Sequence, residues 1–371
     1  MRVWCVMAGL ASSLSPRRAQ LAIVVLLALS SAGCGDDARP GKATRNDAGV
    51  VGLPFSGVSA ELPDRPIAVA TGEGAVWATS MAGGVVTKID PKTNKPVGEK
   101  PTITGGEAPY AIDVAFGKVW VANFNSDQIV RIDPSTRKVI DRIDVDNRPF
   151  GLEDGYGYMW VTSIRRQTIS RLDPRTGERV GRPIKTSGIP YQVAAGEGYI
   201  WVTNIRDGRI DKIDPRSGRL VGRPIEVGAF PGAIAVGGGY VWVANVRGGG
   251  DDDGNSSDSG ASGATESPVN SPPEGNVWRL DPTTGRRVGA PIPVPLRPQA
   301  IAADDASVWV VSVDADTLVR IDAKTGRRDK LPLLVGNAPT DVAIAPAGGP
   351  PGAWVAVSKE DVAARVDLRR R

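Results

Sequence analysis

Seven copies of one short unit recur along this chain of 371 residues, each built on a tryptophan inside an apolar run such as KVWVAN or YIWVTN. An aspartate follows each tryptophan at one fixed spacing, as Asp90 follows Trp77, except in the fifth copy, where the aspartate comes much later. A proline precedes each tryptophan, again at one fixed spacing in every copy but the seventh. The tryptophans are Trp77, Trp120, Trp160, Trp201, Trp242, Trp309 and Trp354. Spacing this regular is typical of a repeat architecture.

One complete unit, residues 189–227, contains four strand-like stretches separated by turn-forming residues. GEG joins the first two stretches, and DPRSG joins the third to the fourth. Aspartate, proline and glycine in these places favour tight hairpin turns. Four short strands in about 40–45 residues form one blade of a β-propeller. We therefore predict an all-β fold, a seven-bladed β-propeller of four-stranded antiparallel blades with the tryptophans packed between blades.

The last unit is incomplete, and its missing piece stands before the first unit. The seventh unit stops at VDLRRR, after its third strand, whereas complete units continue into a phrase such as VGRPI at 180–184 and 221–225. The isolated phrase VGLPF at 51–55 matches that fourth strand. We therefore predict that residues 51–58 complete the seventh blade, so that an N-terminal strand closes a ring spanning residues 51–371.

Two low-complexity segments lie outside this pattern. The fifth unit carries an insertion rich in Gly, Ser, Asp and Pro over 248–275, and residues 35–50 are also polar. Segments with so few apolar residues cannot bury enough surface to become ordered. We predict a disordered insert at 248–275 and a flexible tether at 35–50.

The segment before the tether, 1–34, has the layout of an export signal. Arg17 and Arg18 precede an apolar run over 21–29, which is too short to span a bilayer, and small residues then lead to Cys34. The phrase SAGC resembles a bacterial lipobox, whose cysteine is lipidated after cleavage. We predict a lipoprotein signal peptide over 1–34, lipidation at Cys34 and a place in the bacterial cell envelope, outside the cytoplasm. An ordinary secretory signal with an incidental cysteine is the alternative.

Charge gives no general reason to expect a nucleic-acid partner. The chain has 45 basic and 41 acidic residues, and three of the basic ones lie in the segment 1–34, which leaves 42 (45 − 3) against 41. A nearly neutral protein does not attract anionic polymers or lipid surfaces by its net charge. We expect membrane contact through the lipid anchor only, and a monomer.

The stretch GYIWVTNIRDGRIDKIDPRSGRLVG resembles the bacterial β-propellers with YVTN-type repeats, and it is similar to the streptogramin (virginiamycin B) lyase-like propellers. This resemblance covers essentially residues 51–371, and it implies the fold more strongly than a function. Streptogramin lyases are Mg²⁺-dependent and use histidine, but this chain contains no histidine. The same absence removes Ser-His-Asp and Cys-His catalysis and zinc sites with histidine ligands.

Candidate ligand-binding residues lie near the blade-opening prolines and in the loops after the tryptophan strands, because connections that vary between repeats carry binding groups over a rigid frame. An arc of aromatic residues directly follows three successive prolines, and it either stacks a ring or sugar or packs as rim residues. Asparagines after the tryptophan strands either contact a ligand or cap local backbone, and arginines in the next loops give the rim a basic side. The candidates at the channel mouth are Tyr110, Phe150, Tyr191, Asn123, Asn204, Asn245, Arg165 and Arg206.

Two acidic residues stand out four positions after the proline, where most units have alanine. They are Asp113 and Glu153, in adjacent units. Carboxylates on an innermost strand face a desolvation penalty unless they are paired or hydrated. They either line a wet channel or hold Ca²⁺ or Mg²⁺ through oxygen ligands, and no other cofactor is evident from the sequence.

These features lead to two hypotheses about function. The first is a lipid-anchored extracytoplasmic propeller that binds a small ligand or a partner protein without catalysis. The alternative is a divalent-metal-dependent lyase or lactonase-like hydrolase with its site at the central channel, because such chemistry needs only oxygen ligands and a carboxylate base. A stoichiometric divalent metal in the purified protein would favour the enzyme.

Overall fold

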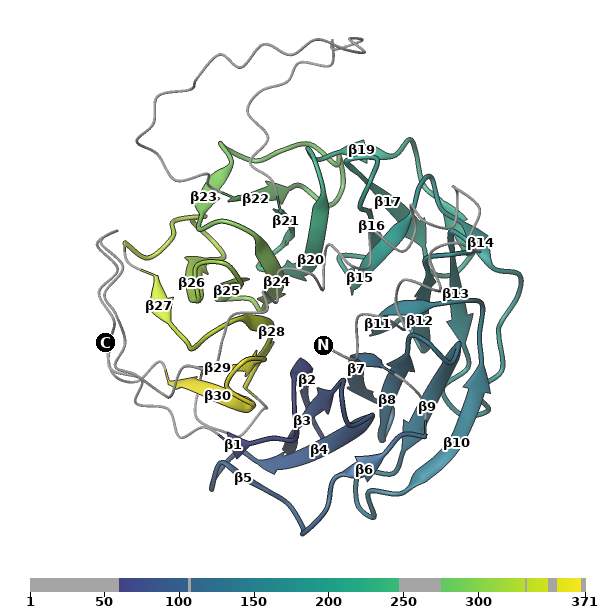
Figure 1. The fold of residues 1–371 in the computed structure, drawn as a ribbon. Helices are drawn as coiled ribbons and strands as arrows, with labels where there is room; N and C mark the ends of the chain where they lie inside the picture. The colour runs from purple at the N-terminus through teal and green to yellow at the C-terminus, as the bar shows by residue number, and fades with distance from the viewer. Residues whose placement is uncertain (1–59, 106–107, 247–274, 331, 346–351, 368–371) are drawn as a thin grey trace, which may run out of the picture. The chain divides into compact units, whose positions relative to one another are not determined.

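Seven antiparallel β-sheets follow one another around a central channel in the computed structural model (Figure 1). The structure describes residues 60–105, 108–246, 275–330, 332–345 and 352–367, all within one compact unit, Gly49–Arg371. Every regular element among them is a strand, and no helix with the length and hydropathy of a membrane span occurs in the described part of the chain. The predicted seven-bladed propeller is confirmed. The signal peptide, Cys34, the tether and the insert lie outside the described residues.

Each blade begins at the channel with a first strand that starts at the repeated proline. These strands are β2 (Pro66–Gly72), β7 (Pro109–Ala115), β11 (Pro149–Gly155), β15 (Pro190–Gly196), β20 (Pro231–Gly237), β24 (Pro298–Ala303) and β28 (Pro339–Ile344). The second strand of each blade carries the tryptophan. These strands are β3 (Ala75–Ser80), β8 (Lys118–Asn123), β12 (Tyr158–Ser163), β16 (Tyr199–Asn204), β21 (Tyr240–Asn245), β25 (Ser307–Ser312) and β29 (Gly352–Val357).

The third strands pair with the second strands, and shorter outer strands complete each sheet. The third strands are β4 (Val85–Asp90), β9 (Gln128–Ile132), β13 (Thr168–Leu172), β17 (Arg209–Asp214), β22 (Gly275–Leu280), β26 (Thr317–Asp322) and β30 (Val362–Asp367). The outer strands are β5 (Lys95–Pro96) with β6 (Thr102–Ile103), β10 (Val139–Asp144), β14 (Ile184–Lys185), β18 (Arg219–Leu220) with β19 (Ile225–Glu226), β23 (Ile292–Val294), β27 (Leu333–Leu334) and β1 (Ala60–Glu61).

The N-terminal strand closes the ring. β1 pairs antiparallel with β30 of the seventh blade, with Ala60 opposite Ala363 and Glu61 opposite Val362. The backbone N–H of Leu62 also donates to the carbonyl oxygen of Asp361 at 2.7 Å. The seventh sheet therefore contains chain from both ends of the propeller, as the truncated last repeat predicts. The predicted strand at 51–58 lies outside the described residues, and the described closure is made by Ala60 and Glu61.

Two-residue turns join the first and second strands in the first five blades. In the first blade Glu73 and Gly74 have φ angles of 51° and 69°, and the same two places are occupied by Phe116 and Gly117 in the second blade. Positive φ at both central residues defines the type I′ turn, whose twist matches that of the flanking strands. These turns gather at one end of the channel, which we call the hairpin face. The opposite end, where the first strands begin, is the proline face.

The tryptophans form the core between neighbouring blades. Trp77 of the first blade is fully buried against Ile112, Val121 and Val130 of the second, and Trp354 of the seventh is packed against residues of the first. An aromatic side chain of this size buries roughly 150–250 Å². Each blade thus provides the side chain that holds it to the next, which explains why one tryptophan is needed in every repeat.

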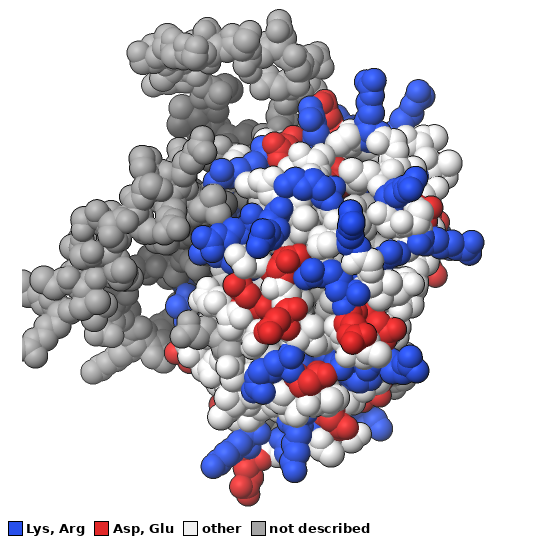
Figure 2. Space-filling view, turned by 90° about the vertical axis from the view of Figure 1, so that its right-hand side faces the viewer, with Lys and Arg blue, Asp and Glu red and all other residues white. Residues whose placement is uncertain are grey.

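The outer wall of the ring carries charges of both signs. Figure 2 shows basic and acidic side chains interspersed on the face turned to the viewer, with no extended area of one sign among the described residues. Exposed ion pairs such as Arg209 with Glu226, at 3.0 Å, contribute little to stability. The channel, rather than this wall, is where unusual chemistry is concentrated.

Candidate functional site: the central channel

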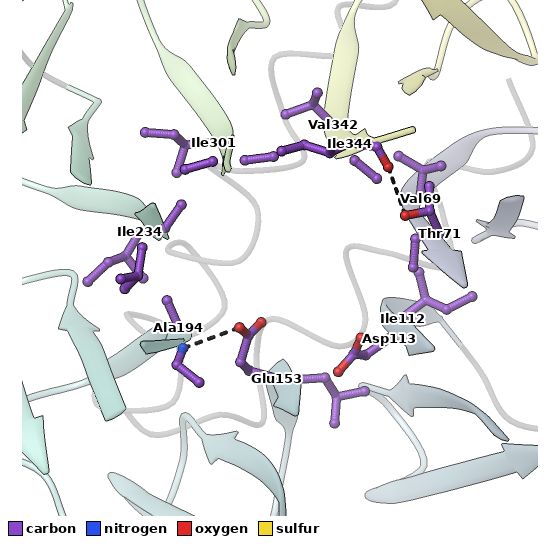
Figure 3. A pocket seen from close by; sticks show the side chains of 18 residues that line it. Val69, Thr71, Ile112, Asp113, Glu153, Ala194, Ile234, Ile301, Val342 and Ile344 are labelled. Atoms are coloured by element: carbon purple, nitrogen blue, oxygen red, sulfur yellow. Dashed lines mark hydrogen bonds between the residues drawn. The ribbon is translucent and has the colours of Figure 1, made fainter. Parts of the chain in front are cut away.

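The seven first strands enclose a cavity of about 310 Å³ (Figure 3). Its lining comes from the third to fifth residues after each proline, such as Val69, Ala70 and Thr71 in the first blade. Alanine, valine, isoleucine and leucine make up most of the lining residues, and their side chains carry no charge. The small residues that recur four positions after the proline are therefore explained by their place around the channel.

Asp113 and Glu153 are the only ionisable residues of the described chain that line this cavity, and they extend from adjacent blades (Figure 3). Asp113 accepts hydrogen bonds from the backbone N–H of Val114 at 2.7 Å and, across the blade boundary, from that of Asp154 at 2.8 Å. Glu153 accepts one from the N–H of Ala195 in the fourth blade at 3.2 Å. Because a first strand has a sheet neighbour on one side only, these carboxyl groups bond backbone donors that its ladder leaves free.

Burial changes the protonation of both groups. Loss of hydration, followed by repulsion from Asp154, raises the pKa of Asp113 to about 7, against the opposing effect of its two N–H donors. Loss of hydration, followed by repulsion from Asp113, raises the pKa of Glu153 well above its ordinary value. Carboxyl groups in a poorly solvated site without a cation keep their protons to a higher pH. The channel therefore holds acids that are only partly ionised near neutral pH.

A third buried acid was not anticipated from the sequence. Asp341 in the seventh blade accepts hydrogen bonds from the N–H of Val69 in the first blade and from the N–H of Val342, each at 2.9 Å. Burial raises its pKa to about 7, with the two N–H donors acting in the opposite direction. It stands two positions after the opening proline, where the other blades have Ala, Gly or Gln. The sequence signal that could have identified Asp341 is an acidic residue within the otherwise uncharged strand PTDVAI.

The aromatic arc is a packed cluster. The rings of Tyr110 and Phe150 have centroids 4.3 Å apart, and those of Phe150 and Tyr191 are stacked at 4.0 Å. Phe150 is 4% exposed, and Phe124 packs against it at 6.1 Å, beneath the guanidinium group of Arg148. We call Tyr110, Phe150 and Tyr191 the aromatic cap. In this structure the three rings contact one another, and a role in ligand stacking stays a prediction.

The aromatic cap reaches across the proline-face end of the channel. Burial, then the phenol of Tyr191 and the carboxyl group of Asp341, raise the pKa of Tyr110 well above its usual value. Burial raises the pKa of Tyr191, which Tyr110, Arg297 and Gln299 oppose. The electrostatic environment of the two phenols thus includes Asp341 of the seventh blade for Tyr110, and Arg297 and Gln299 of the sixth blade for Tyr191.

The three candidate asparagines are buried at the ends of their second strands. Asn204 donates to the hydroxyl of Ser187 at 3.1 Å, and Asn245 donates to the carbonyl oxygen of Val227 at 2.8 Å. Both contacts hold the segment that leads into the same blade. The side-chain amide of Asn123 is buried without a hydrogen-bond partner among the described residues. Asn245 caps local backbone and Asn204 contacts a nearby side chain, and a ligand contact by any of the three stays a prediction.

The charged residues in the loops at the proline face are of two kinds, exposed arginines and aspartates that hydrogen-bond to backbone. Arg165 and Arg206 are exposed in the loops after the second strands of the third and fourth blades. On the acidic side, Asp316 accepts from the N–H of Ala338 and Asp361 from that of Arg65, at 2.8 and 2.7 Å. These acids fix the loop before the next blade, whereas the two arginines remain candidates for contact with a ligand.

The channel acids are also the residues available to a metal ion. Both oxygens of Asp113 already accept backbone hydrogen bonds, and Glu153 accepts its bond through one oxygen. Within the described ranges, no group of three or more Asp, Glu, His or Cys residues is arranged to hold a metal. Ca²⁺ takes six to eight oxygen ligands, so a metal here would draw most of its ligands from water or from a substrate.

Comparisons with known proteins support the fold. No family model matches the chain, and no curated protein matches it. Hydrazine synthase from Kuenenia stuttgartiensis has a similar structure, with a TM-score of 0.67 and 17% identity over 88% of this chain and 100% of that chain. A catalytically inactive virginiamycin B lyase from Staphylococcus aureus, solved with quinupristin, gives 0.63 and 18% over 84% and 99%. The WD40 repeats of RRP9 give 0.64 and 9% over 83% and 95%. Identities this low show a shared propeller fold and nothing finer.

Proposed function

We propose that this propeller is a non-catalytic binding module, exported and anchored through Cys34, with its ligand site in the central channel. The observation that carries the proposal is the cavity itself, about 310 Å³ in volume, which is lined mostly by residues with apolar side chains and has two acids on one side. Concave sites of this size and composition, with a few convergent polar groups, are typical of small-molecule sites. The aromatic cap lies at one end of the channel and adds aromatic surface to such a site.

The absence of histidine supports a role in binding rather than catalysis. The inactive Staphylococcus aureus lyase carries a histidine-to-alanine substitution, and the present chain has no histidine at any position. Histidine is the usual general acid or base near neutral pH. The hydrogen bonds that Asp113 and Glu153 accept across blade boundaries also give these acids a structural task.

The second candidate is a metal-dependent lyase or lactonase-like hydrolase. Two carboxyl groups at one channel wall favour it, since they could share a divalent cation or act as a base when ionised. Elemental analysis of the purified protein separates the two candidates. One equivalent of divalent metal that resists dialysis and is lost from an Asp113→Asn, Glu153→Gln variant would favour the enzyme.

The binding proposal is tested by narrowing the channel. Full-length protein in detergent is screened by thermal unfolding against small organic molecules with neutral, anionic and cationic head groups. Ala235→Leu places a larger side chain in the channel wall, on the fifth blade, away from both acids. We expect at least one molecule to raise the melting temperature of the wild type and of the exposed-surface control Leu220→Ser, but not of Ala235→Leu. Equal stabilisation of all three proteins would place the ligand elsewhere.

A further inference from the structure

The charged side chains of the channel lie on one side of it only. Its acids, Asp113 and Glu153, project from the second and third blades, whereas the lining from the fourth to sixth blades is Ala, Val and Ile. Thr71 is the only other described lining residue with a polar side chain, and its hydroxyl group already donates to the carbonyl oxygen of Ile344 at 2.8 Å. The charged side chains therefore lie on one wall, and a molecule in this space can place a polar head there and an apolar body against the alkyl side chains opposite, which stand beside exposed backbone of the first strands.

The two acids have no cationic partner within the described part of the chain. The ion pairs found there join Arg131 to Asp141, Arg179 to Asp146, Arg209 to Glu226 and Arg297 to Asp314. Of the described residues, no Lys or Arg lines the cavity. A poorly hydrated carboxylate is costly unless it meets a cation or a strong hydrogen-bond donor. A bound cation would supply what the described residues do not place there.

Aromatic residues occupy the hairpin-face end of the same two strands. Phe116 and Tyr156 stand three positions beyond Asp113 and Glu153, and their side chains are 39% and 46% exposed. The equivalent places in the other described blades hold Glu, Gly or Asp. Large aromatic residues are unusual in a tight turn with positive φ, and their ring faces attract cations. The aromatic cap lies at the other end of the channel. The hydroxyl of Tyr156 accepts a hydrogen bond from the N–H of Gly198 in the fourth blade at 2.7 Å. A molecule that enters from the hairpin face would meet these two rings beside the acids.

We propose that the channel binds a small organic cation, a primary amine on a compact apolar body, with its ammonium group between Asp113 and Glu153. The inference rests on the proposed binding function and names its ligand class. The ammonium group donates up to three hydrogen bonds to the carboxylates, and the apolar body lies against the alanine and isoleucine wall. A bare divalent metal fits less well, because it requires six or more oxygen ligands and only Asp113 and Glu153 among the described lining residues carry carboxylate oxygens.

Three matched small molecules test whether the channel prefers a cationic head group on its ligand. Cyclohexylmethylamine, cyclohexylmethanol and cyclohexanecarboxylate share one apolar body and carry a cationic, neutral and anionic head at pH 7.5. Binding is measured by isothermal titration calorimetry on the full-length protein in detergent. We expect the amine to bind at least tenfold more tightly than the alcohol, and the carboxylate to bind most weakly.

The double variant Asp113→Asn, Glu153→Gln is the matched control. Each amide keeps one acceptor oxygen and loses the charge, so the asparagine at 113 can keep one of the two backbone bonds that Asp113 accepts. Circular dichroism and thermal unfolding check that the fold is retained. We expect this variant to bind the amine and the alcohol equally. An unchanged preference for the amine would show that the head group lies elsewhere and would overturn the inference.

The remaining outcomes separate this inference from the proposed function. If the alcohol or the carboxylate binds more tightly than the amine, the channel binds ligands but not cations, and only the inference fails. If Ca²⁺ or Mg²⁺ stabilises the wild type but not the double variant while the amine does not, the site is a metal site and the inference fails. If none of the three probes binds, the cation inference also fails, and the binding function is then decided by the Ala235→Leu screen alone.

Discussion

The guanidinium group of Arg365 in the seventh blade donates a hydrogen bond to the carbonyl oxygen of Pro91 in the first blade, at 3.1 Å. The same kind of bond recurs at most of the other blade boundaries. In each case a Lys or Arg two positions before the repeated Asp reaches the turn that follows that Asp in the next blade. The other pairs are Lys88 with Pro134, Arg131 with Pro174, Arg171 with Pro215, Lys212 with Pro282 and Arg279 with Lys324.

Several of these cations also lie over the tryptophans of their own blades. The ammonium group of Lys88 is 5.3 Å from the ring of Trp77, and the guanidinium group of Arg131 is 5.2 Å from that of Trp120. A cation over an aromatic face is favourable by about 0.5–2 kcal/mol, depending on exposure. The tryptophan and the cation therefore act together, one by packing and one by a charge-assisted hydrogen bond, to join each blade to the next.

We predict that removing the last of these bonds weakens ring closure. Arg365→Leu keeps an apolar side chain but leaves the carbonyl oxygen of Pro91 without its donor. A hydrogen bond to a charged group contributes about 1.5–3 kcal/mol, and the free energy of unfolding should fall by an amount of that order. Urea titration followed by tryptophan fluorescence measures it. The control Arg286→Leu changes an exposed arginine in another turn, and an equal loss in both variants would contradict the prediction.

Stability should depend on pH through Asp341. Its pKa in the folded protein, about 7, lies above the ordinary 3.8, so the native state keeps a proton that the unfolded chain has lost. Unfolding then releases a proton, and this group makes the protein less stable as pH rises from about 4 to 7. The phenol of Tyr110 faces this carboxyl group, and it stays protonated over that range.

Asp341→Asn tests this dependence, because the amide resembles the protonated acid and does not titrate. The amide can accept only one of the two N–H bonds of Asp341, which costs the variant the same stability at every pH. We expect its stability relative to the wild type to rise from pH 5 to pH 8 by on the order of 1–3 kcal/mol, below the roughly 1.4 kcal/mol per pKa unit that full burial would allow. Melting curves from pH 4 to 8 provide the measurement. Parallel pH profiles of the two proteins would rule out Asp341 as the titrating group.

The N-terminal strand should be essential to the seventh blade. Deleting residues 51–61 removes β1 and exposes the edge of β30, together with the core position that Ala60 fills beside Trp354. We expect a melting temperature lower by several degrees and a tendency to associate through the open edge. Deleting residues 35–45 shortens the tether by the same length and serves as the control. Calorimetry and light scattering follow both effects, and an unchanged wild-type profile after the 51–61 deletion would refute the role of the strand.

Anchoring should depend on Cys34 alone. Cys34→Ser is expected to abolish labelling by a fatty-acid probe and to release the protein from the membrane fraction. Cys5→Ser, which changes the other cysteine of the chain, should leave labelling intact. The measurement is click labelling followed by fractionation. Persistent labelling of Cys34→Ser would show that the lipobox interpretation is incorrect.

Local pattern was enough to predict the blades. The prolines, tryptophans and aspartates recur at fixed offsets, and each specifies a strand start, a core side chain or a turn in its own immediate stretch of chain. The missing fourth strand of the last unit then indicated a closed ring, because a blade with an open edge is incomplete. The channel position of Asp113 and Glu153 followed from the same offsets, since first strands with small residues must be the crowded inner ones.

Only the tertiary structure decided what these side chains contact. Asp341 hydrogen-bonds to Val69, and Arg365 hydrogen-bonds to Pro91. The last blade therefore contacts the first, although the two lie at opposite ends of the propeller sequence. Tyr110, Phe150 and Tyr191 stack on one another because neighbouring blades bring successive prolines to one mouth of the channel. Such contacts depend on how far each blade is rotated about the channel axis and on how closely neighbouring blades pack. Those quantities are set by packing around the whole ring, and no local stretch of the sequence encodes them.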